Sequence, residues 1–124
     1  MEPHHGKPRG PRKKKVQDFD DLCEALCMLE TPQEARAFMS DLCTQAELSA
    51  MSERYKIAKL LLLNNLPYRE IAKQTGASTT TIGRVASFLF SDQVLGYETL
   101  IRRQEQNNEN DQNQISITTQ GKAR

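Results

Sequence analysis

The chain lacks most of the features that mark enzymes, secreted proteins and membrane proteins. Its 124 residues include no tryptophan, four phenylalanines, three tyrosines and three cysteines. No apolar run approaches the roughly 18 residues that a membrane-spanning helix needs, so we expect no transmembrane segment and no membrane partner. The N-terminal segment is basic but has no apolar centre, which argues against a secretory signal. A single domain is the simplest expectation for this length.

The few cysteines and histidines do not form a recognisable catalytic or metal-binding pattern. Without an export signal, Cys23, Cys27 and Cys43 are expected to stay reduced. Cys23 and Cys27 are four residues apart on a predicted helix and could share a metal, but the leucines around them favour a place in the core. His4 and His5 lie in the basic N-terminal segment, and no carboxylate pair or nucleophile accompanies them. We therefore expect no metal, no cofactor and no enzymatic activity.

Charge is divided unevenly along a chain whose formal net charge is only +1. Residues 1–15 carry six basic residues against one acid, residues 16–51 carry one against eight, and residues 52–91 carry six against two. The last of these segments also contains the strongest structural motif in the chain. A positive surface at that motif suits a phosphate backbone, although scattered basic residues could also do no more than solvate a helix surface.

That motif is the sequence YREIAKQTGASTTTIGRVASF, which is typical of a helix-turn-helix. Gly76 can take the positive φ angle that ends a first short helix, and Ser78 stands where a second helix needs its N-cap. The small Ala72 allows the two helices to approach closely. The apolar positions that can fill the space behind the helices are Ile71, Ala77, Ile82 and Val85. We predict helices at about 68–74 and 79–90, with a plain helical hairpin as the alternative.

Four more helices are predicted around this motif, which makes the fold all-α with six helices. Apolar residues at helical spacing predict a first helix over 18–30 and a sixth over 93–104. Capping boxes begin a second helix at Thr31 and a third at Thr44, and the third runs to about Asn64. Each helix has its own apolar stripe, which a monomer with roughly 90 ordered residues covers poorly. We therefore expect a homodimer that shares one core, rather than a tight monomer.

The ordered domain is expected to span residues 16–104, with the helix-turn-helix at about 68–90. Residues 1–15 are rich in proline, glycine, lysine and arginine. We interpret them as a disordered basic arm that either follows a DNA backbone or only keeps the protein soluble. Residues 105–124 are interpreted as a disordered tail, because eight of the eleven residues from Gln104 to Gln114 are glutamine or asparagine.

These motifs resemble the Trp repressor superfamily, and in particular its branch of related bacterial proteins that lack an assigned ligand. The resemblance rests on DLCTQAEL, on Arg54 in SERYKIAKLL and on TGASTTTIGRV, and it covers residues 41–91 well. It implies an intertwined, all-helical homodimer that binds operator DNA as a transcriptional repressor. Such a protein works in the cytoplasm, at the nucleoid.

The resemblance also implies a ligand pocket, and the chain departs from the family there. Arg54 and Arg84 match the two arginines that enclose tryptophan in the Trp repressor, and Thr44 matches a threonine that helps to line the pocket. Val85 stands where the repressor has a glycine, and Phe88 stands where it has a serine that contacts the amino acid. Fitting an indole beside these larger side chains would cost about 1–3 kcal/mol. We therefore expect a filled, vestigial pocket and DNA binding without L-tryptophan or another effector.

The DNA-contacting residues are expected on the two helices of the motif. The candidate set is Tyr68, Arg69, Lys73, Ser78, Thr79, Thr80, Thr81, Gly83 and Arg84. By resemblance, Thr79, Thr80 and Gly83 match base-facing positions. Arg69 and Lys73, on the first helix of the motif, approach phosphates or are plain solvated charges. Thr81 could equally be partly buried. Arg84 is either a phosphate contact or a remnant of the ligand site.

Other functions of the same fold stay open at this point. One is a repressor that responds to a different small molecule. Another is a protein-interaction or RNA-binding module that uses the acidic first two helices. The recognition domain of a transposase or recombinase is disfavoured, because the chain has no room for a catalytic domain.

Overall fold

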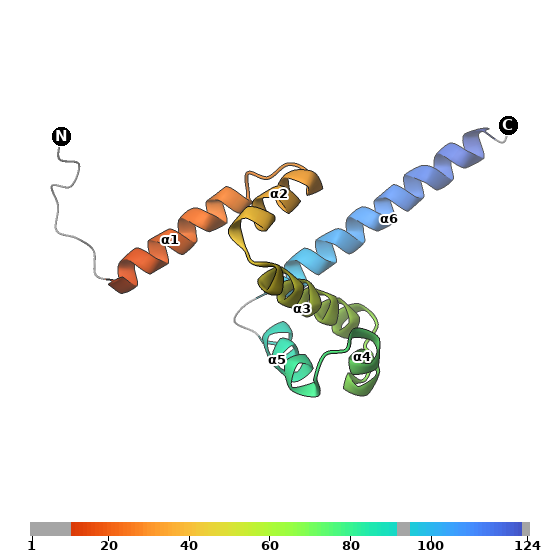
Figure 1. Cartoon of the computed structure of the whole chain (residues 1–124). Coiled ribbons are helices and arrows are strands. Elements are labelled where there is room, and N and C mark those ends of the chain that lie inside the picture. Colours follow the sequence, from red (N-terminus) through yellow and green to blue (C-terminus); the bar gives the residue numbers. More distant parts are fainter. Residues whose placement is uncertain (1–10, 92–94, 123–124) are drawn as a thin grey trace, which may run out of the picture. The chain divides into compact units, whose positions relative to one another are not determined.

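The computed structural model describes residues 11–91 and 95–122, which form six helices and no strand (Figure 1). The helices are α1 (Pro11–Leu26), α2 (Pro32–Leu42), α3 (Gln45–Leu63), α4 (Tyr68–Thr75), α5 (Thr79–Leu89) and α6 (Gly96–Lys122). This architecture confirms the predicted six-helix, all-α class. The chain divides into two compact units, Met1–Leu48 and Ser49–Arg124. None of the described helices is both long enough and apolar enough to cross a membrane.

The first unit contains α1, α2 and the start of α3, and none of its described side chains is fully buried. Helix α2 begins as predicted. The Thr31 hydroxyl accepts a hydrogen bond from the Glu34 N–H at 3.1 Å, and Pro32 occupies the first turn, where its missing N–H costs nothing. The large apolar residues that stay exposed in this unit are Val16, Phe19, Leu26, Met28 and Leu42. This unit therefore has apolar surface without a core of its own.

Helix α3 begins with a reciprocal capping box. The Glu47 N–H donates to the Thr44 hydroxyl oxygen at 3.1 Å, and the Thr44 N–H donates to the Glu47 carboxylate at 2.8 Å. Each bond satisfies an N–H group that the first helical turn would otherwise leave without a partner. The box predicted from the sequence is confirmed in both directions.

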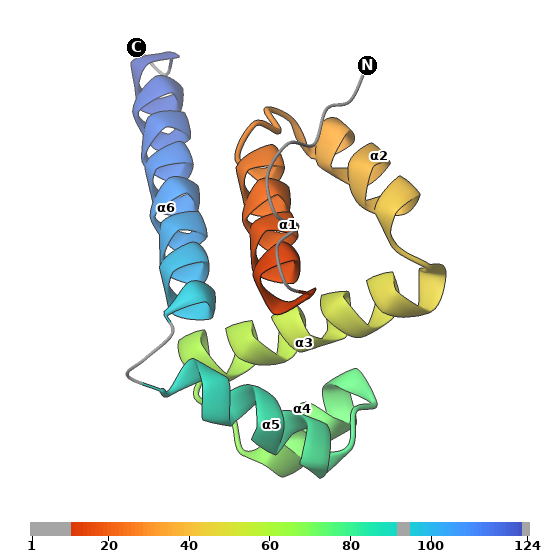
Figure 2. The same cartoon turned by 90° about the vertical axis from the view of Figure 1, so that its left-hand side faces the viewer.

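The second unit holds the hydrophobic core. Buried side chains from four helices and one turn meet there, and they are Ile57, Ala58, Leu61, Ile71, Ala77, Ile82, Val85, Ala86, Leu89 and Ile101. Helices α4 and α5 lie next to one another against α3 (Figure 2). Ala72 is partly buried against this core, as the sequence predicts for the close contact of the two helices.

The turn of the helix-turn-helix has the predicted geometry. Gly76 has φ +78° and its N–H donates to the Ala72 carbonyl at 2.8 Å, which closes α4 in the left-handed conformation. Ser78 then caps α5, and its hydroxyl accepts from the Thr81 N–H at 3.1 Å. The helix-turn-helix predicted over about 68–90 is therefore present as Tyr68–Leu89.

The two ends of the helical region differ from the sequence predictions. Helix α1 covers Pro11–Leu26 rather than 18–30, so the last five residues of the predicted basic arm are helical. Proline fits the first helical position, and arginine and lysine are good helix formers. The predicted arm residues 1–10 lie outside the described residues.

Helix α6 continues to Lys122, well beyond the end predicted at residue 104. The glutamine- and asparagine-rich segment is therefore helical through residue 122 rather than a disordered tail. Glutamine and glutamate are good helix formers, asparagine is a weaker one, and residues 97–120 contain no glycine or proline to interrupt the helix. The composition favoured disorder because this segment contains few apolar residues to bury.

Candidate nucleic-acid interface and adjacent cavity

Exposed hydroxyl groups gather at the N-terminus of α5. The Ser78 hydroxyl donates to the Thr81 hydroxyl oxygen at 3.0 Å and accepts from the Thr81 N–H, so these two side chains are engaged with each other. Thr81 is partly buried, whereas Thr79 and Thr80 are exposed. Ser78 and Thr81 therefore hold the start of the helix, and Thr79 and Thr80 are the residues that a partner can reach.

Gly83 and Tyr68 lie against each other across the two helices of the motif. A methyl group at Gly83 would sit 3.9 Å from Cε2 of Tyr68, which is an ordinary van der Waals distance. Packing in the free protein therefore does not require glycine at this position. Tyr68 keeps 44% of its surface exposed, so its ring borders α5 and still faces solvent.

Basic side chains on α4 flank this surface. Arg69 and Lys73 are both exposed and are four residues apart, which places them on one face of the helix. In the part of the chain that the structure describes, one ion pair is present, between the Arg102 Nε and a Glu98 carboxylate oxygen at 3.7 Å. The charges of Arg69 and Lys73 are therefore not neutralised by a neighbouring acid.

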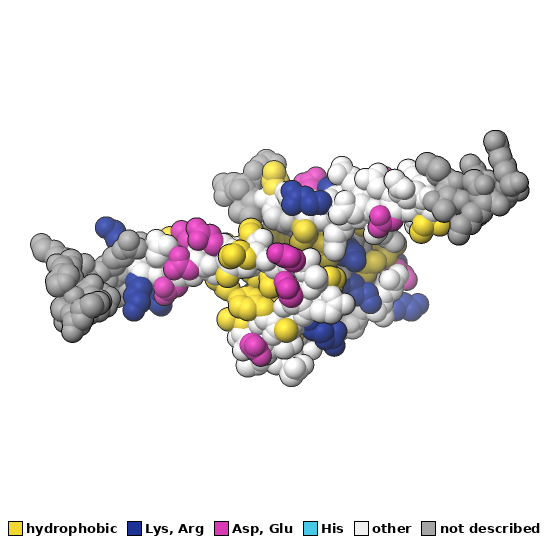
Figure 3. Space-filling view, turned by 90° about the horizontal axis from the view of Figure 1, so that it is seen from above, with side chains coloured by type: hydrophobic (Ala, Val, Ile, Leu, Met, Phe, Trp, Pro, Cys, Tyr) yellow, Lys and Arg dark blue, Asp and Glu magenta, His cyan; other side chains and the backbone are white. Residues whose placement is uncertain are grey.

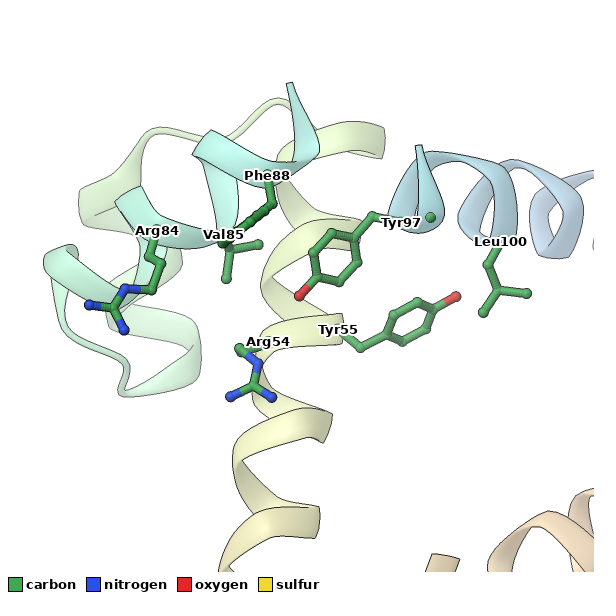
Figure 4. A pocket seen from close by; sticks show the side chains of 8 residues that line it. Arg54, Tyr55, Arg84, Val85, Phe88, Tyr97 and Leu100 are labelled. Carbon is green, nitrogen blue, oxygen red and sulfur yellow. The ribbon is translucent and has the colours of Figure 1, made fainter. Parts of the chain in front are cut away.

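A cavity of about 590 Å³ lies beside the motif in the second unit (Figure 4). Its walls come from three helices, and the lining residues are Arg54, Tyr55, Arg84, Val85, Phe88, Gly96, Tyr97 and Leu100. The two arginines lie toward one end of the cavity and Leu100 lies toward the other (Figure 4). The cavity thus combines a largely apolar wall with two guanidinium groups that have no acidic partner among the described residues.

Tyr55 joins one wall of the cavity to the base of α6. Its hydroxyl donates a hydrogen bond to the Gln104 side-chain oxygen, and the Lys59 ammonium nitrogen lies 5.6 Å from the centre of its ring. Burial raises the pKa of Tyr55 above its ordinary value of 10.0. The shift moves the titration of the phenol further from neutral pH, where the hydroxyl is a proton donor in any case. These contacts hold α3 and α6 together at the cavity.

The structure gathers four of the five predicted ligand-site residues around one cavity. Arg54, Arg84, Val85 and Phe88 all line the cavity, which associates Arg84 with this space. Both Val85 and Phe88 lie in the wall of an open cavity, Val85 at 2% exposed and Phe88 at 57% exposed. That these two side chains exclude an indole stays a prediction. Thr44 is not among the lining residues and instead caps α3.

Four lining residues were not predicted from the sequence as part of a site. Gly96, Tyr97 and Leu100 come from α6, and Tyr55 is the neighbour of Arg54 on α3. Tyr97 and Leu100 carry the three-residue spacing of an apolar helix face, which indicates burial but not the identity of the facing helix. Only the position of Tyr55 next to Arg54 offered a signal.

Comparisons with known proteins point to one family. The family model described as Trp repressor protein matches residues 17–105. YerC, an uncharacterised protein of Bacillus subtilis (strain 168), is 36% identical over 73 residues, which make up 59% of this chain and 69% of that protein. A Trp operon repressor homolog of Xylella fastidiosa (strain 9a5c) is 30% identical over 73 residues, or 59% of this chain and 79% of that protein. The crystal structure of a TrpR-like protein from Eubacterium eligens ATCC 27750 has a TM-score of 0.66 and 36% identity, covering 76% of this chain and 95% of that chain.

Proposed function

Because the chain belongs to the Trp repressor protein family, a family of DNA-binding transcription regulators, we propose that it is a sequence-specific repressor that binds duplex operator DNA as a homodimer. The observation that carries the proposal is the helix-turn-helix of α4 and α5. Its second helix starts with exposed hydroxyl groups, and its first helix carries basic side chains without acidic partners. No enzymatic step is part of this function.

The contacts are expected to divide between the two helices of the motif. Arg69 and Lys73 bind backbone phosphates, which position the protein on the duplex but carry no sequence information. Thr79 and Thr80 reach base edges, where a threonine can donate, accept or touch a thymine methyl group. Gly83 has no side chain, so it lets the DNA approach the backbone of α5 closely. Packing within the free protein tolerates a methyl group at this position, so the need for glycine is attributed to DNA binding.

The uncovered apolar surface of the first unit supports the homodimer. Helices α1 and α2 expose large apolar side chains and bury none completely. A second copy of the chain offers the same apolar stripes in return, as a two-fold interface requires. Two recognition helices in such a dimer can enter successive major grooves about 34 Å apart.

The repressor is proposed to bind DNA without L-tryptophan. In the family resemblance, the position after Arg84 is a glycine beside the amino acid, whereas Val85 here places a branched side chain in the wall of the cavity. Adding an indole against that side chain would force repacking of the core that Val85 belongs to. The arginines are retained, but the shape that the indole needs is changed.

A second candidate is a repressor that responds to a different small molecule, and the open cavity favours it. Two unpaired arginines and an apolar wall suit an anion with an apolar body.

Isothermal titration calorimetry with L-tryptophan tests the leading proposal, and the double variant Val85→Gly, Phe88→Ser is the matched comparison. We expect no saturable binding to the natural chain and measurable binding to the variant. Saturable micromolar binding to the natural chain would contradict tryptophan independence.

In vitro selection from random duplex DNA, with no added small molecule, tests the DNA-binding function itself. We expect a palindromic sequence with half-sites about one helical turn apart, as two recognition helices of a dimer require. Recovery of no sequence above background would contradict an effector-independent reader. A subsequent comparison with single-stranded RNA and with cell proteins would then separate a gated repressor from an interaction module.

A further inference from the structure

We infer that Thr75, the last residue of α4, is a positioning residue that sets the orientation of α5 toward the bases of the operator. The inference rests on the proposed function and deepens it, because Thr75 would govern sequence preference without belonging to the DNA-contacting set. Its basis is a pair of hydrogen bonds that the Thr75 hydroxyl makes within the turn between the two helices.

The end of α4 leaves one backbone N–H of the turn without a helical acceptor. The Gly76 N–H donates to the Ala72 carbonyl at 2.8 Å, which is the single bond of a helix end closed by one left-handed residue. In such an end, the following N–H, that of Ala77, is not bonded back to the helix. Ala77 is only 8% exposed, so water reaches it poorly. The turn therefore needs an acceptor from a side chain.

The Thr75 hydroxyl supplies this acceptor. The Ala77 N–H donates to the Thr75 Oγ1 atom at 3.2 Å. The same hydroxyl donates its own proton to the Ile71 carbonyl at 2.8 Å, which is the backward bond that threonine makes in helices. Because the proton is directed at Ile71, the oxygen lone pairs are left to accept from Ala77. The side chain is thus held by two bonds.

This hydroxyl differs from the polar groups that face solvent. Uncharged side chains and backbone make up much of the surface in Figure 3, where water can complete their hydrogen bonds. Thr75 is partly buried, and so are both of its hydrogen bonds. Removal of the hydroxyl would leave a donor that water does not readily reach, so the turn would have to move to restore a partner.

The bond to Ala77 lies directly before the start of α5. Ser78 follows Ala77 and is the N-cap of that helix, where its hydroxyl accepts from the Thr81 N–H at 3.1 Å. The hydrogen bonds of Thr75 and Ser78 therefore join the end of the first helix to the first turn of the second. A shift of Ala77 would be passed on to the start of α5.

Apolar packing also holds the two helices, but it does not fix their angle as closely. Ile71 of α4 and Ile82 of α5 are both fully buried in the core. The hydrophobic effect is non-directional, whereas a hydrogen bond weakens steeply away from linear geometry. We therefore assign to Thr75 the finer placement of α5, on which the reach of Thr79 and Thr80 to base edges depends.

The experiment uses the full chain and four variants. Thr75→Val and Thr75→Ala both remove the hydroxyl, the first with little change in side-chain shape, whereas Thr75→Ser retains it. Thr31→Val is the matched control. It also removes a hydroxyl that accepts from a backbone N–H, at 3.1 Å, but at the start of α2 and outside the motif.

Fluorescence anisotropy measures the affinity of each chain for the selected operator and for an unrelated duplex of the same length, at a temperature where all the chains are folded. The ratio of the two affinities should fall about tenfold in both hydroxyl-free variants of Thr75, as expected when a base-edge contact is misplaced. Thr75→Ser should keep the natural ratio. Thr31→Val should keep it too, even with a lower thermal midpoint.

Amide hydrogen exchange at Ala77, measured by nuclear magnetic resonance, reports the hydrogen bond itself. Exchange should be faster in Thr75→Val and Thr75→Ala and stay slow in Thr75→Ser. An unchanged affinity ratio in both hydroxyl-free variants, or an equal loss in Thr75→Ser, would overturn the inference while leaving the repressor proposal intact. If the natural chain prefers no duplex, the proposed function is overturned, and the positioning role with it.

An equal loss of the affinity ratio in Thr31→Val would also overturn the inference. The loss would then follow from reduced stability of the fold rather than from the placement of α5.

Discussion

At the scale of single residues, Gly76 and Gly83 have different physical reasons to be glycine. Gly76 has φ +78°, and a methyl group there would meet no atom within 4 Å, so the backbone conformation alone favours glycine. Gly83 is an ordinary helical residue within α5, where a methyl group would make an ordinary contact with Tyr68. Gly76 is therefore favoured by the backbone conformation of the turn. Gly83 is not required by the fold, and we attribute it to DNA binding.

Alanine at these two positions should separate folding from binding. Gly76→Ala should lower the free energy of unfolding by about 1 kcal/mol, because a Cβ atom is strained in the left-handed region. Gly83→Ala should raise it by up to about 1 kcal/mol through helix propensity, yet weaken operator binding. Urea denaturation and anisotropy on the selected operator measure the two effects. Unchanged operator affinity for Gly83→Ala would remove Gly83 from the DNA-facing set.

The two helices of the motif should also differ in what their substitutions change. Arg69→Ala should weaken binding to every duplex and reduce the salt slope by about 0.9, because a phosphate contact is lost. Thr80→Ala should alter the order of preference among operator variants, because base-edge contacts specify sequence. A panel of single-base operator substitutions at two salt concentrations measures both. Equal, sequence-independent losses from the two variants would refute this division.

At the scale of elements, the start of α3 depends on a charge that pH can remove. The Thr44 backbone N–H, and then the Thr44 side chain, lower the pKa of Glu47 below its ordinary value of 4.5. A carboxyl group with a lowered pKa in the folded state stabilises the fold at pH values above its unfolded pKa. That stabilisation is lost as pH falls through the lowered folded value.

The variant Glu47→Gln should therefore change the pH dependence of stability in one range. At neutral pH the natural chain should be more stable than the variant. The difference should shrink as pH falls from about 4.5 through the lowered pKa of Glu47, because the natural side chain then becomes neutral as well. Urea denaturation at fixed protein concentration from pH 7 to pH 3 measures this. A difference that stays constant over the range would mean that the carboxylate charge does not contribute.

Helix α6 illustrates how an element can exceed the region that anchors it. Ile101 is buried and the Gln104 side chain accepts from Tyr55, so the first part of the helix is fixed to the core. From Arg102 to Ser116 every side chain is exposed. The anchored first turns remove the cost of helix nucleation, so the helix can continue without tertiary contacts through a segment in which glutamine and glutamate alternate with weaker helix formers such as asparagine.

At the scale of the whole molecule, the distribution of buried residues is the strongest argument for self-association. All fully buried apolar residues described here lie between Ile57 and Ile101, while α1 and α2 keep large apolar side chains exposed. If the dimer covers these side chains, folding and association are coupled, so apparent stability depends on protein concentration. A monomer has no such dependence.

A tenfold rise in protein concentration should therefore raise the thermal midpoint, and Phe19→Glu should lower the midpoint and weaken the dimer. Phe19 is 64% exposed on α1, so its substitution would place a charge in the proposed interface. Ile115→Glu is the matched control, because Ile115 is 65% exposed on α6 and lies beyond the matched residues 17–105. Thermal denaturation at two protein concentrations measures the midpoint, and sedimentation equilibrium measures the dimer affinity of each variant. Equal dissociation by the two variants would argue against a specific role for α1.

The sequence by itself determined the features that depend on neighbouring residues. The turn at Gly76, the cap at Ser78 and the capping box at Thr44 follow from contacts within four residues, and each is present as predicted. The helical class and the buried face of α5 follow from spacing along one helix. The ends of α1 and α6 were not determined, because composition does not reveal where a helix is anchored.

Only the tertiary structure decided what surrounds the arginines. Arg54, Arg84 and Tyr97 lie far apart in the sequence, and they meet because α3, α5 and α6 pack around one space. Whether Val85 and Phe88 fill that space depends on the directions of their side chains, which the substitution of a glycine and a serine does not reveal. Local chemistry thus determined the helix-turn-helix motif, whereas non-local packing determined the cavity beside it.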